Sequence, residues 1–401
     1  MFRPAKVTRE SPGDKVSQSA AVPDYGTNPA QAGPAQYDLE QGVLKFLERE
    51  REVGSFPGAV WAAGHARGIE AEGLLGHSVL KPARMAMETD TIFDVASLTK
   101  PLITGTLILR AWADGLLDPS DRASKFLPEL RGTEKETITI LDLLTHRGGF
   151  QAWYPLYTQG LGKDAYLSAI KARPLRYRPG TRQIYTCLGF ILLIQIAERL
   201  WGEPIPLLAD RLIFQPLGLR NSMFNPSSSL VHRIAATEWG NANERHMIRR
   251  RKLQFDQWRD TMIWGEVNDG NAWYMGGIGG NAGLFSTARD VFEIGRAWID
   301  GSERLLPADI IDRALRNYTI GLEENRGLGW QLHTSKPDHP TARLSPRAFG
   351  HTGFTGTSIY IDPDRELIMV LLTNRLHPSC KPINTNYIRR NFHSLILDAW
   401  D

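Results

Sequence analysis

The sequence predicts an α+β fold in which one antiparallel sheet is built from both ends of the chain and flanked by helices, with a largely helical region inserted between them. Strand-like runs occur near the N-terminus and again near the C-terminus, whereas the middle carries long apolar stretches with helical spacing. The 401 residues give room for two domains or one large one, and 42% hydrophobic with 23% charged residues is typical of globular proteins. A chain of this length needs neither disulfides nor metal to hold a core.

The N-terminal part predicts a leader followed by the first half of the sheet. Residues 1–36 are rich in Pro, Ala, Gly, Ser and Gln and lack hydrophobic periodicity, so we expect them to be flexible. An amphipathic helix is predicted to open at Tyr37, because apolar residues recur there on one helical face. Two strands bounded by glycine follow, over residues 58–64 and 73–80.

The C-terminal part mirrors this pattern. The stretch GTSIYIDPDRELIMVLLTNR predicts two strands joined by a turn at residues 362–364, and a closing helix is predicted over residues 385–400. We therefore expect one domain over residues 37–401. Its sheet region would comprise about residues 37–96 and 282–401, and its helical region about residues 97–281.

The middle of the chain carries several helix signals. Thr139 and Thr287 are each followed three residues later by Asp, which resembles a capping box. The stretch LGFILLIQIAERLWG has the composition of a buried helix that ends at Gly202. The basic stretch over residues 245–260 is predicted to be an insertion or long loop with a solvated surface.

Charge and composition exclude several classes of function. The 47 basic and 44 acidic residues leave a net charge of +3, too small to favour nucleic acid as the main partner. Cys187 and Cys380 form at most one disulfide and lack zinc-ligand spacing, so no metal is expected. No apolar run reaches the length of a membrane span. The stretch 277–282 resembles a dinucleotide-binding loop without a clear preceding strand, so no cofactor is expected.

The compartment is predicted from the N-terminus. Early basic residues there have no apolar segment behind them, so no secretory signal is visible and a cytoplasmic protein is expected. A processed or misassigned start would instead make a periplasmic location possible. The sequence does not indicate an oligomeric state.

Ser97 and Lys100 form the first candidate catalytic pair. They lie three residues apart at the start of the apolar, helical stretch DVASLTKPLITGTLIL, so the hydroxyl and the amine share one helix face. A helix N-terminus stabilises developing negative charge, and burial makes a lysine lose its proton more readily. A neutral lysine can accept the serine proton, which predicts an activated nucleophile. A serine N-cap followed by a surface lysine is the alternative.

Two further segments carry candidate residues. Tyr185 precedes the buried helix, and a phenol near a lysine can act as a general base; a core tyrosine with a satisfied hydroxyl is the alternative. The segment from His351 to Phe354 opens a predicted strand, where Gly353 allows close approach to the backbone. The N–H groups of Phe354 and Ser97 would then bind an oxyanion, unless the segment is a plain strand entry.

Taken in order, Ser-x-x-Lys, Tyr, and a basic residue before Thr-Gly resemble the signature of penicillin-recognising serine hydrolases. Longer blocks are also similar to the superfamily of class C β-lactamases, penicillin-binding proteins and family VIII carboxylesterases. These blocks are ITILDLLTHRGGF, PGTRQIYTCLGFILL, IFQPLGLRNSMFNP, GGNAGLFSTARDV, LGWQL and FGHTGFTG, in family order. The resemblance implies a β-lactamase/penicillin-binding-protein-like fold for nearly the whole chain past the leader. His146, in the first block, is expected to be structural.

The resemblance also implies a role for each candidate residue. Ser97 would be the acylated nucleophile, Lys100 its activating partner, and Tyr185 the base or proton relay. His351 would support the tyrosine hydroxyl or the substrate, and the N–H groups of Ser97 and Phe354 would form the oxyanion hole. The family's acyl-enzyme chemistry uses neither metal nor cofactor.

Two departures from the family pattern bear on the substrate. Many members have Asn or Asp where this chain has Cys187, and a thiol is a weak substitute for an amide that holds an acylamino group. β-Lactamases usually have Lys at the position of His351, and a histidine is mostly neutral at pH 7. Both changes weaken recognition of substrates with an amide and a carboxylate, although His-Thr-Gly also occurs among the family's peptidases.

We therefore expect a serine hydrolase that cleaves small or medium acyl esters, with weak or no action on β-lactams. The alternatives are a D-alanyl-D-alanine carboxypeptidase, penicillin-binding protein or β-lactamase, an acyltransferase, and a non-catalytic binding protein of the same fold. The partner would be a small-molecule ester, amide or β-lactam. The candidate residues are Ser97, Lys100 and Tyr185 for catalysis, and His351, Thr352, Gly353, Phe354 and Cys187 for oxyanion or substrate binding.

Overall fold

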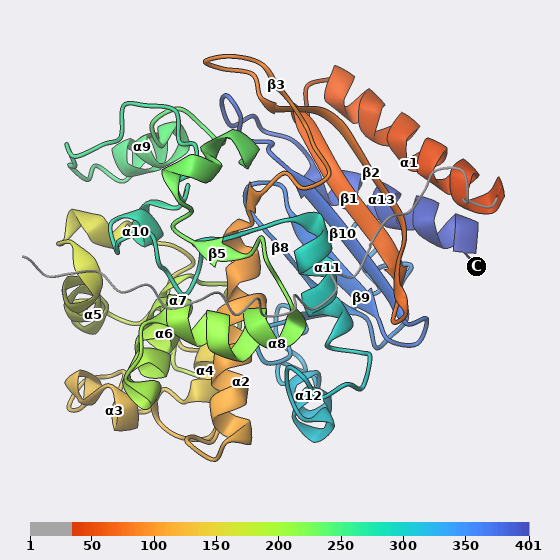
Figure 1. The fold of residues 1–401 in the computed structure, drawn as a ribbon. Coiled ribbons are helices and arrows are strands. Elements are labelled where there is room, and N and C mark those ends of the chain that lie inside the picture. Colours follow the sequence, from red (N-terminus) through yellow and green to blue (C-terminus); the bar gives the residue numbers. More distant parts are fainter. Residues whose placement is uncertain (1–33, 401) are drawn as a thin grey trace, which may run out of the picture.

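A long antiparallel sheet joins the two ends of the chain in the computed structural model, which describes residues 34–400 (Figure 1). Within these residues the sheet has seven strands, in the spatial order β3 (Met85–Ala86), β2 (Gly68–Val79), β1 (Gly58–His65), β10 (Leu367–Thr373), β9 (Ser358–Asp362), β8 (Phe349–Thr352) and β7 (Gln331–Leu332). The N-terminal and C-terminal strands meet where β1 pairs with β10, from Ala59 opposite Thr373 to Gly64 opposite Ile368. The predicted α+β class and the sheet built from both ends are confirmed.

The strands lie where they were predicted except at β8 and β2. The segment from His351 to Phe354 was predicted to open a strand, but β8 ends at Thr352 and Phe354 lies in the turn that follows. β2 differs at its start. This strand begins at Gly68, five residues before its predicted start, and pairs with β1 across an irregularity at Ala63 and Gly64. Its first residues are only half-buried, so their side chains show little of the alternation that predicts a strand.

Helices from both chain ends cover one face of the sheet. α1 (Pro34–Glu52) and α13 (Thr385–Trp400) lie side by side there (Figure 1). α13 has the predicted bounds, whereas α1 begins three residues before the predicted Tyr37. Trp61 of β1 is fully buried in this core, with its ring 5.9 Å from that of Phe392. The predicted leader lies, for residues 1–33, outside the described residues.

The opposite face of the sheet packs against α11 (Ala288–Arg296) and the helical region (Figure 1). The other helices within the described residues are α2 (Thr106–Ala113), α3 (Ala123–Phe126), α4 (Ile140–Leu144), α5 (Gly162–Ala172), α6 (Leu188–Trp201), α7 (Ile205–Ala209), α8 (Gln215–Leu217), α9 (Ala242–Arg250), α10 (Gly270–Trp273) and α12 (Ala308–Ala314). α6 is the buried helix that the sequence predicts, and it ends at Gly202 in the left-handed conformation with φ of 66°. Treating the sheet and helical regions as parts of one domain with these boundaries stays a prediction.

A second, small sheet supports the segment that carries Ser97. Its strands, within the described residues, are β4 (Phe93–Asp94), β6 (Leu284–Ser286) and β5 (Met223–Phe224), all antiparallel. The sequence analysis did not predict this sheet, because strands of two or three residues are too short to show a period. It fixes β4 directly before the nucleophile turn.

The helix caps agree with the sequence in part. Thr139 and Asp142 form the complete reciprocal capping box at α4. Thr287 caps α11 by accepting from Asp290 N at 3.2 Å, but the Asp290 carboxylate accepts from Asn221 N and Ser222 Oγ instead of returning to the cap. Only half of the second predicted box is therefore formed.

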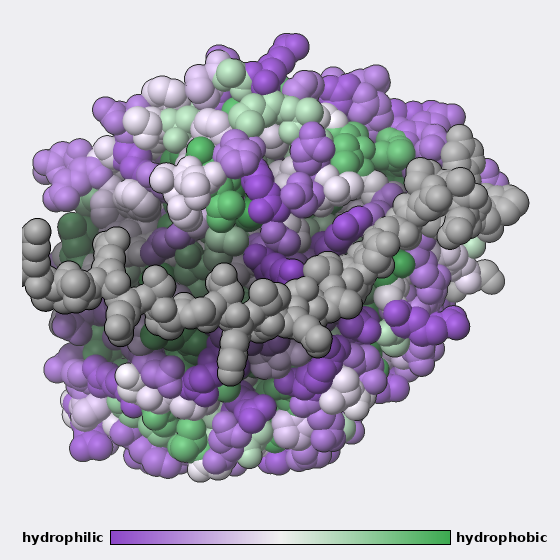
Figure 2. Space-filling model, in the orientation of Figure 1, coloured by the Kyte–Doolittle hydropathy of each residue, from purple (hydrophilic) through white to green (hydrophobic). Residues whose placement is uncertain are grey.

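The surface is mostly polar on the face shown in Figure 2, where hydrophobic residues appear in small patches among hydrophilic ones. Within residues 34–400, none of the helices combines the length and the apolarity needed to cross a bilayer.

Candidate active site

Ser97 lies in a tight turn at the start of a continuous helical segment. A 3₁₀ turn over Ala96–Leu98 leads into a π-helical turn over Lys100–Gly105 and then into α2. Ala96 has φ of 50°, a conformation that L-residues adopt only when the surroundings enforce it. Asp94 Oδ1 enforces it by accepting from Ala96 N at 2.9 Å. The turn leaves Ser97 partly exposed while its neighbours are buried.

Lys100 is fully buried and points at Ser97. Its Nζ donates to Ser97 Oγ at 2.8 Å and to Asn281 O at 3.0 Å. The alternative of a serine N-cap with a surface lysine is therefore wrong. The hydroxyl and the amine are already within hydrogen-bond distance, as the three-residue spacing predicts.

The surroundings of Lys100 act on its pKa in two directions. Burial lowers the pKa of its ammonium, but the side chains of Cys187 and Tyr185 beside it and the Asp269 carboxylate raise it, so that the pKa lies above the ordinary lysine value. The sequence analysis left the protonation state of Lys100 open and considered only burial, which acts in the opposite direction. The apolar surroundings were visible in the sequence, but these three neighbours were not.

Tyr185 stands at the centre of a ring of basic side chains. Lys100 Nζ lies 5.0 Å and Arg326 Cζ 5.4 Å from the centroid of its ring. The imidazole centroids of His146 and His351 lie 4.6 and 5.8 Å from it.

Both histidines beside Tyr185 are neutral. Burial first, and then the positive charges of Arg326 and Lys100, hold the pKa values of His146 and His351 well below the usual range. His351 Nδ1 lies 2.9 Å from Thr352 O and therefore carries the proton, which leaves a lone pair on Nε2. His146 Nδ1 accepts from Thr186 N at 3.1 Å, so its proton is on Nε2. His351 supplies no fixed positive charge.

The turn after β8 packs directly against the nucleophile turn. Thr355 Oγ1 donates to Asp94 O at 2.7 Å, and Thr357 Oγ1 donates to Val95 O at 2.9 Å. A Cβ atom on Gly353 would lie 2.5 Å from Val95 O, so only glycine fits there. This close approach is what the sequence analysis predicts for Gly353. Thr352 ends β8, opposite Ser358 of β9.

The Phe354 backbone lies in this same turn. Its side chain is 44% exposed, and within the described residues neither its N–H nor that of Ser97 donates to another protein group. The two turns are joined by the contacts above, so both donors are available on neighbouring pieces of backbone. An oxyanion hole needs two such donors, and the assignment of the Ser97 and Phe354 N–H groups to one stays a prediction.

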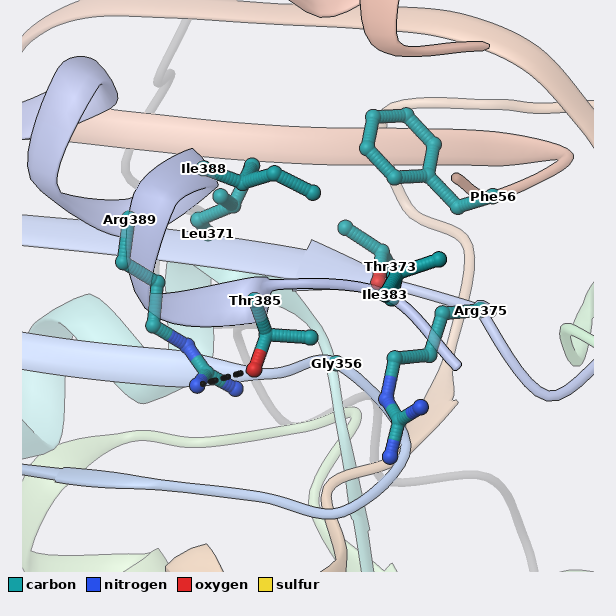
Figure 3. Close-up of a pocket in the computed structure, with 9 residues that line it drawn as sticks. All are labelled: Phe56, Gly356, Leu371, Thr373, Arg375, Ile383, Thr385, Ile388 and Arg389. Carbon is teal, nitrogen blue, oxygen red and sulfur yellow. Dashed lines mark hydrogen bonds between the residues drawn. The ribbon is translucent and has the colours of Figure 1, made fainter. Parts of the chain in front are cut away.

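Arg389 of α13 donates hydrogen bonds to the same turn. This residue of α13 is buried, and its Nη2 donates to Gly353 O at 3.2 Å and to Thr357 O at 3.1 Å. Its Nη1 donates to Thr385 Oγ1 at 3.1 Å, the bond drawn in Figure 3. Figure 3 also shows Arg375 beside the same small hollow, and its Nε donates to Phe354 O at 2.7 Å. Two arginines therefore fix the carbonyl groups on either side of the Phe354 amide.

Cys187 lies beside Lys100 at the base of the site. It is buried, and burial raises the pKa of its thiol, which is therefore protonated at neutral pH. Asn281 is 1% exposed, and its side-chain amide contacts the Cys187 thiol. Cys380 is a free thiol elsewhere on the chain.

Three residues of the site were missed by the sequence analysis. Asp94 and Asn281 lie within stretches quoted above and Arg326 lies two residues before another, but single Asp, Asn or Arg residues carry no spacing signal. Asp94 directly precedes the Val-Ala-Ser turn, which is the one position where a local carboxylate acceptor could have been inferred. His146 was expected to be structural, and its ring packs against Tyr185 and Phe190. Among the described residues, no three His, Cys, Asp or Glu side chains gather so as to hold a metal ion.

Comparison with known proteins agrees with this geometry. The Beta-lactamase family model matches residues 44–390. A protein of Escherichia coli strain K12 named "Putative D-alanyl-D-alanine carboxypeptidase" is 34% identical over 326 residues, which cover 75% of this chain and 73% of that protein.

Solved structures share the fold. "EstCE1, a hydrolase with promiscuous acyltransferase activity" has a TM-score of 0.70 at 20% identity and covers 89% of this chain and 100% of its own. A "Beta-Lactamase/D-Alanine Carboxypeptidase from Pseudomonas syringae" has a TM-score of 0.70 at 20% identity and covers 90% of this chain and 99% of its own. The family match extends over most of the chain, and the chain belongs to the beta-lactamase family of serine hydrolases.

Proposed function

We propose that this chain hydrolyses esters of small or medium acyl groups through an acyl-enzyme on Ser97. The observation that carries the proposal is the hydrogen bond of 2.8 Å from Lys100 Nζ to Ser97 Oγ, with Tyr185 on the other side of Lys100. A serine hydroxyl that contacts an ammonium close to a tyrosine side chain can lose its proton to the tyrosine oxygen as it attacks a carbonyl carbon.

The first half of the reaction forms the acyl-enzyme. Ser97 Oγ attacks the ester carbonyl carbon and its proton passes to the Tyr185 oxygen, which the Lys100 ammonium stabilises as an anion. The bond to the alcohol oxygen then breaks, and the proton leaves with the alcohol. In the second half water attacks the acyl carbon, gives its proton to Tyr185, and releases the acid as Ser97 recovers its hydrogen.

The negative charge on the carbonyl oxygen would be held by the N–H groups of Ser97 and Phe354. Support comes from the close packing of the two turns and from the two arginines that fix the second turn. Such preorganised donors contribute a large share of the rate in acyl transfer, about 10²–10³-fold for one donor.

The choice of ester substrates follows from two side chains. His351 is neutral, so it offers no fixed charge to a substrate carboxylate. Cys187 is a protonated thiol, which hydrogen-bonds an acylamino group poorly. A substrate that carries neither group loses nothing in this site.

A D-alanyl-D-alanine carboxypeptidase is the second candidate, and the name of the 34% identical relative favours it. A substrate panel separates the two. We would compare p-nitrophenyl butyrate, a peptide ending in D-Ala-D-Ala, and a chromogenic cephalosporin, with wild type and Ser97→Ala, and with an added alcohol to detect acyl transfer.

Serine-dependent turnover of the ester, with slow cleavage of peptide and cephalosporin, is the expected result. Faster release of D-alanine than of p-nitrophenol would overturn the ester assignment in favour of the carboxypeptidase. Ester turnover that survives in Ser97→Ala would overturn the nucleophile itself.

A further inference from the structure

Arg326 is a buried cation that no recognised motif contains. It lies between α12 and β7 and is 4% exposed. Its backbone is pinned, since Arg326 N donates to Thr319 Oγ1 at 2.7 Å and Arg326 O accepts from Tyr318 N at 2.9 Å. The position of this guanidinium is therefore set by the fold.

Its side chain is only partly paired. Nη2 contacts Glu324, but Nε and Nη1 are buried and, within the described residues, have no hydrogen-bond partner. The Glu324 side chain is 42% exposed, so solvent screens its charge. Burying a guanidinium with two unpaired N–H groups reduces the stability of the fold. We therefore expect a functional role among the groups that surround it.

The side chain that it faces is Tyr185. Arg326 Cζ lies 5.4 Å from the centroid of the Tyr185 ring, nearly the same distance as the 5.0 Å of Lys100 Nζ. The other groups around the phenol are His146 and His351, which Arg326 itself helps to keep neutral. Tyr185 is thus flanked by two cations.

The acidic groups nearby act on other members of the cluster. Asp269 and Cys187 interact with Lys100, and Glu324 interacts with Arg326. His351 is neutral and supplies no fixed charge where β-lactamases usually have a lysine, whereas the Arg326 guanidinium lies close to the Tyr185 ring and keeps two unpaired N–H groups.

We propose that Arg326 is a positioning residue that supplies positive charge beside Tyr185, together with Lys100, so that the Tyr185 oxygen can take the Ser97 proton at neutral pH. This inference rests on the proposed function, in which Tyr185 is the proton acceptor. Arg326 would act through Tyr185 and would not touch the substrate.

The test is the pH dependence of Ser97 acylation by p-nitrophenyl butyrate, measured in single turnovers at low ionic strength. Removing a unit charge at this distance shifts a titration by about one pH unit if the effective dielectric lies between those of protein and water. In Arg326→Gln the rising limb of the plot of acylation rate against pH should therefore move to higher pH by about one unit, with about tenfold slower acylation at pH 7. Arg326→Lys should return this limb to its wild-type position, and KM should change little in either variant.

A second variant keeps the test independent of folding. Glu324→Gln removes the half-exposed partner and leaves Arg326 in place, so the limb should move a few tenths of a unit to lower pH. If both variants keep the wild-type limb, or if Arg326→Gln and Arg326→Lys lose rate equally without a shift, Arg326 is merely structural and the inference is overturned.

Tyr185→Phe separates this inference from the function on which it rests. If Tyr185→Phe abolishes acylation while Arg326→Gln leaves the limb unmoved, only the role of Arg326 fails. If Tyr185→Phe acylates with the wild-type rate and pH profile, the proposed proton acceptor is wrong and the inference falls with it.

Discussion

At the scale of single residues, Cys187 and Asn281 together determine how the base of the site is lined. The thiol lies where a side-chain amide is usual in the family, and it contacts the amide of the neighbouring Asn281. An Asn at position 187 would place a second amide beside Lys100 and Asn281.

Cys187→Asn is predicted to increase the rate of acylation by a penicillin about tenfold, the effect of one hydrogen bond of about 1–1.5 kcal/mol to the acylamino group. Labelling with a fluorescent penicillin, in parallel with Cys187→Ser as a control for size, measures it. An unchanged rate in Cys187→Asn would mean that this position does not limit recognition of amide substrates.

The sequence predicts which residues gather here better than it predicts their charges. Ser97, Lys100 and Tyr185 lie close together as expected. The sequence predicts this because the spacing of Ser97 and Lys100 on a helix and the order of the family motifs can be read without the fold. The ammonium form of Lys100 depends on Cys187, Tyr185 and Asp269, which approach it only in the folded chain. Arg326 and Asn281 are single residues, so no local pattern marks them.

At the scale of elements, the strained turn before Ser97 depends on Asp94. Its two carboxylate oxygens accept from Ala96 N at 2.9 Å and from Asn268 N at 2.7 Å, while burial raises the pKa of Asp94 to about 6. The unfolded-state pKa of an aspartate is about 3.9. The folded protein therefore binds a proton between these two values that the unfolded chain has lost.

Because this folded-state pKa is raised, the stability due to Asp94 is present below about pH 4 and lost as pH rises through about 6. The loss amounts to about 3 kcal/mol, from about two units at 1.36 kcal/mol each. Urea unfolding of wild type and Asp94→Asn between pH 4 and 8 measures it as the difference between the two curves. Curves that run parallel across this range would refute the assignment.

Long elements were predictable from sequence and short or irregular ones were not. β1, β9, β10, α6 and α13 have clear periods or dense apolar runs, and each lies where it was expected. The basic stretch over residues 245–260 was expected to be a solvated loop, yet its first part belongs to α9. Later in that stretch Phe255 and Trp258 pack on Tyr157, and Arg259 is 8% exposed. The prediction considered only the basic charge of this stretch, and it could not include the aromatic contacts because they depend on Tyr157, about 100 residues earlier in the chain.

At the scale of the whole molecule, the sheet separates two hydrophobic cores. Val60 and Ala62 of β1 face the core shared with the helical region, whereas Ala59, Trp61 and Ala63 face the core under α1 and α13. The candidate site lies on the helical side, at the junction of the nucleophile turn and β8. Stability and chemistry can therefore be changed separately.

Trp61→Ala is predicted to reduce the free energy of unfolding by about 3–5 kcal/mol, because it removes a fully buried aromatic ring from the core under α13. The rate of ester hydrolysis per folded molecule should stay close to that of wild type. Thermal or urea unfolding, with activity normalised to the folded fraction, measures both. A changed pH profile in this variant would show that the two cores are coupled.

Both chain ends carry strong strand signals, and the pairing of β1 with β10 joins the two ends in one sheet. The compartment and the boundaries of the domain stay predictions.

The most direct measurement of the central claim is mass spectrometry of the intact protein, quenched shortly after exposure to p-nitrophenyl butyrate. Wild type should gain one butyryl group, located on the peptide that contains Ser97. Ser97→Ala should gain none, and Lys100→Met should stay folded and acylate about 10²–10⁴-fold more slowly. A butyryl adduct that persists in Ser97→Ala, or that maps to another residue in wild type, would contradict the account.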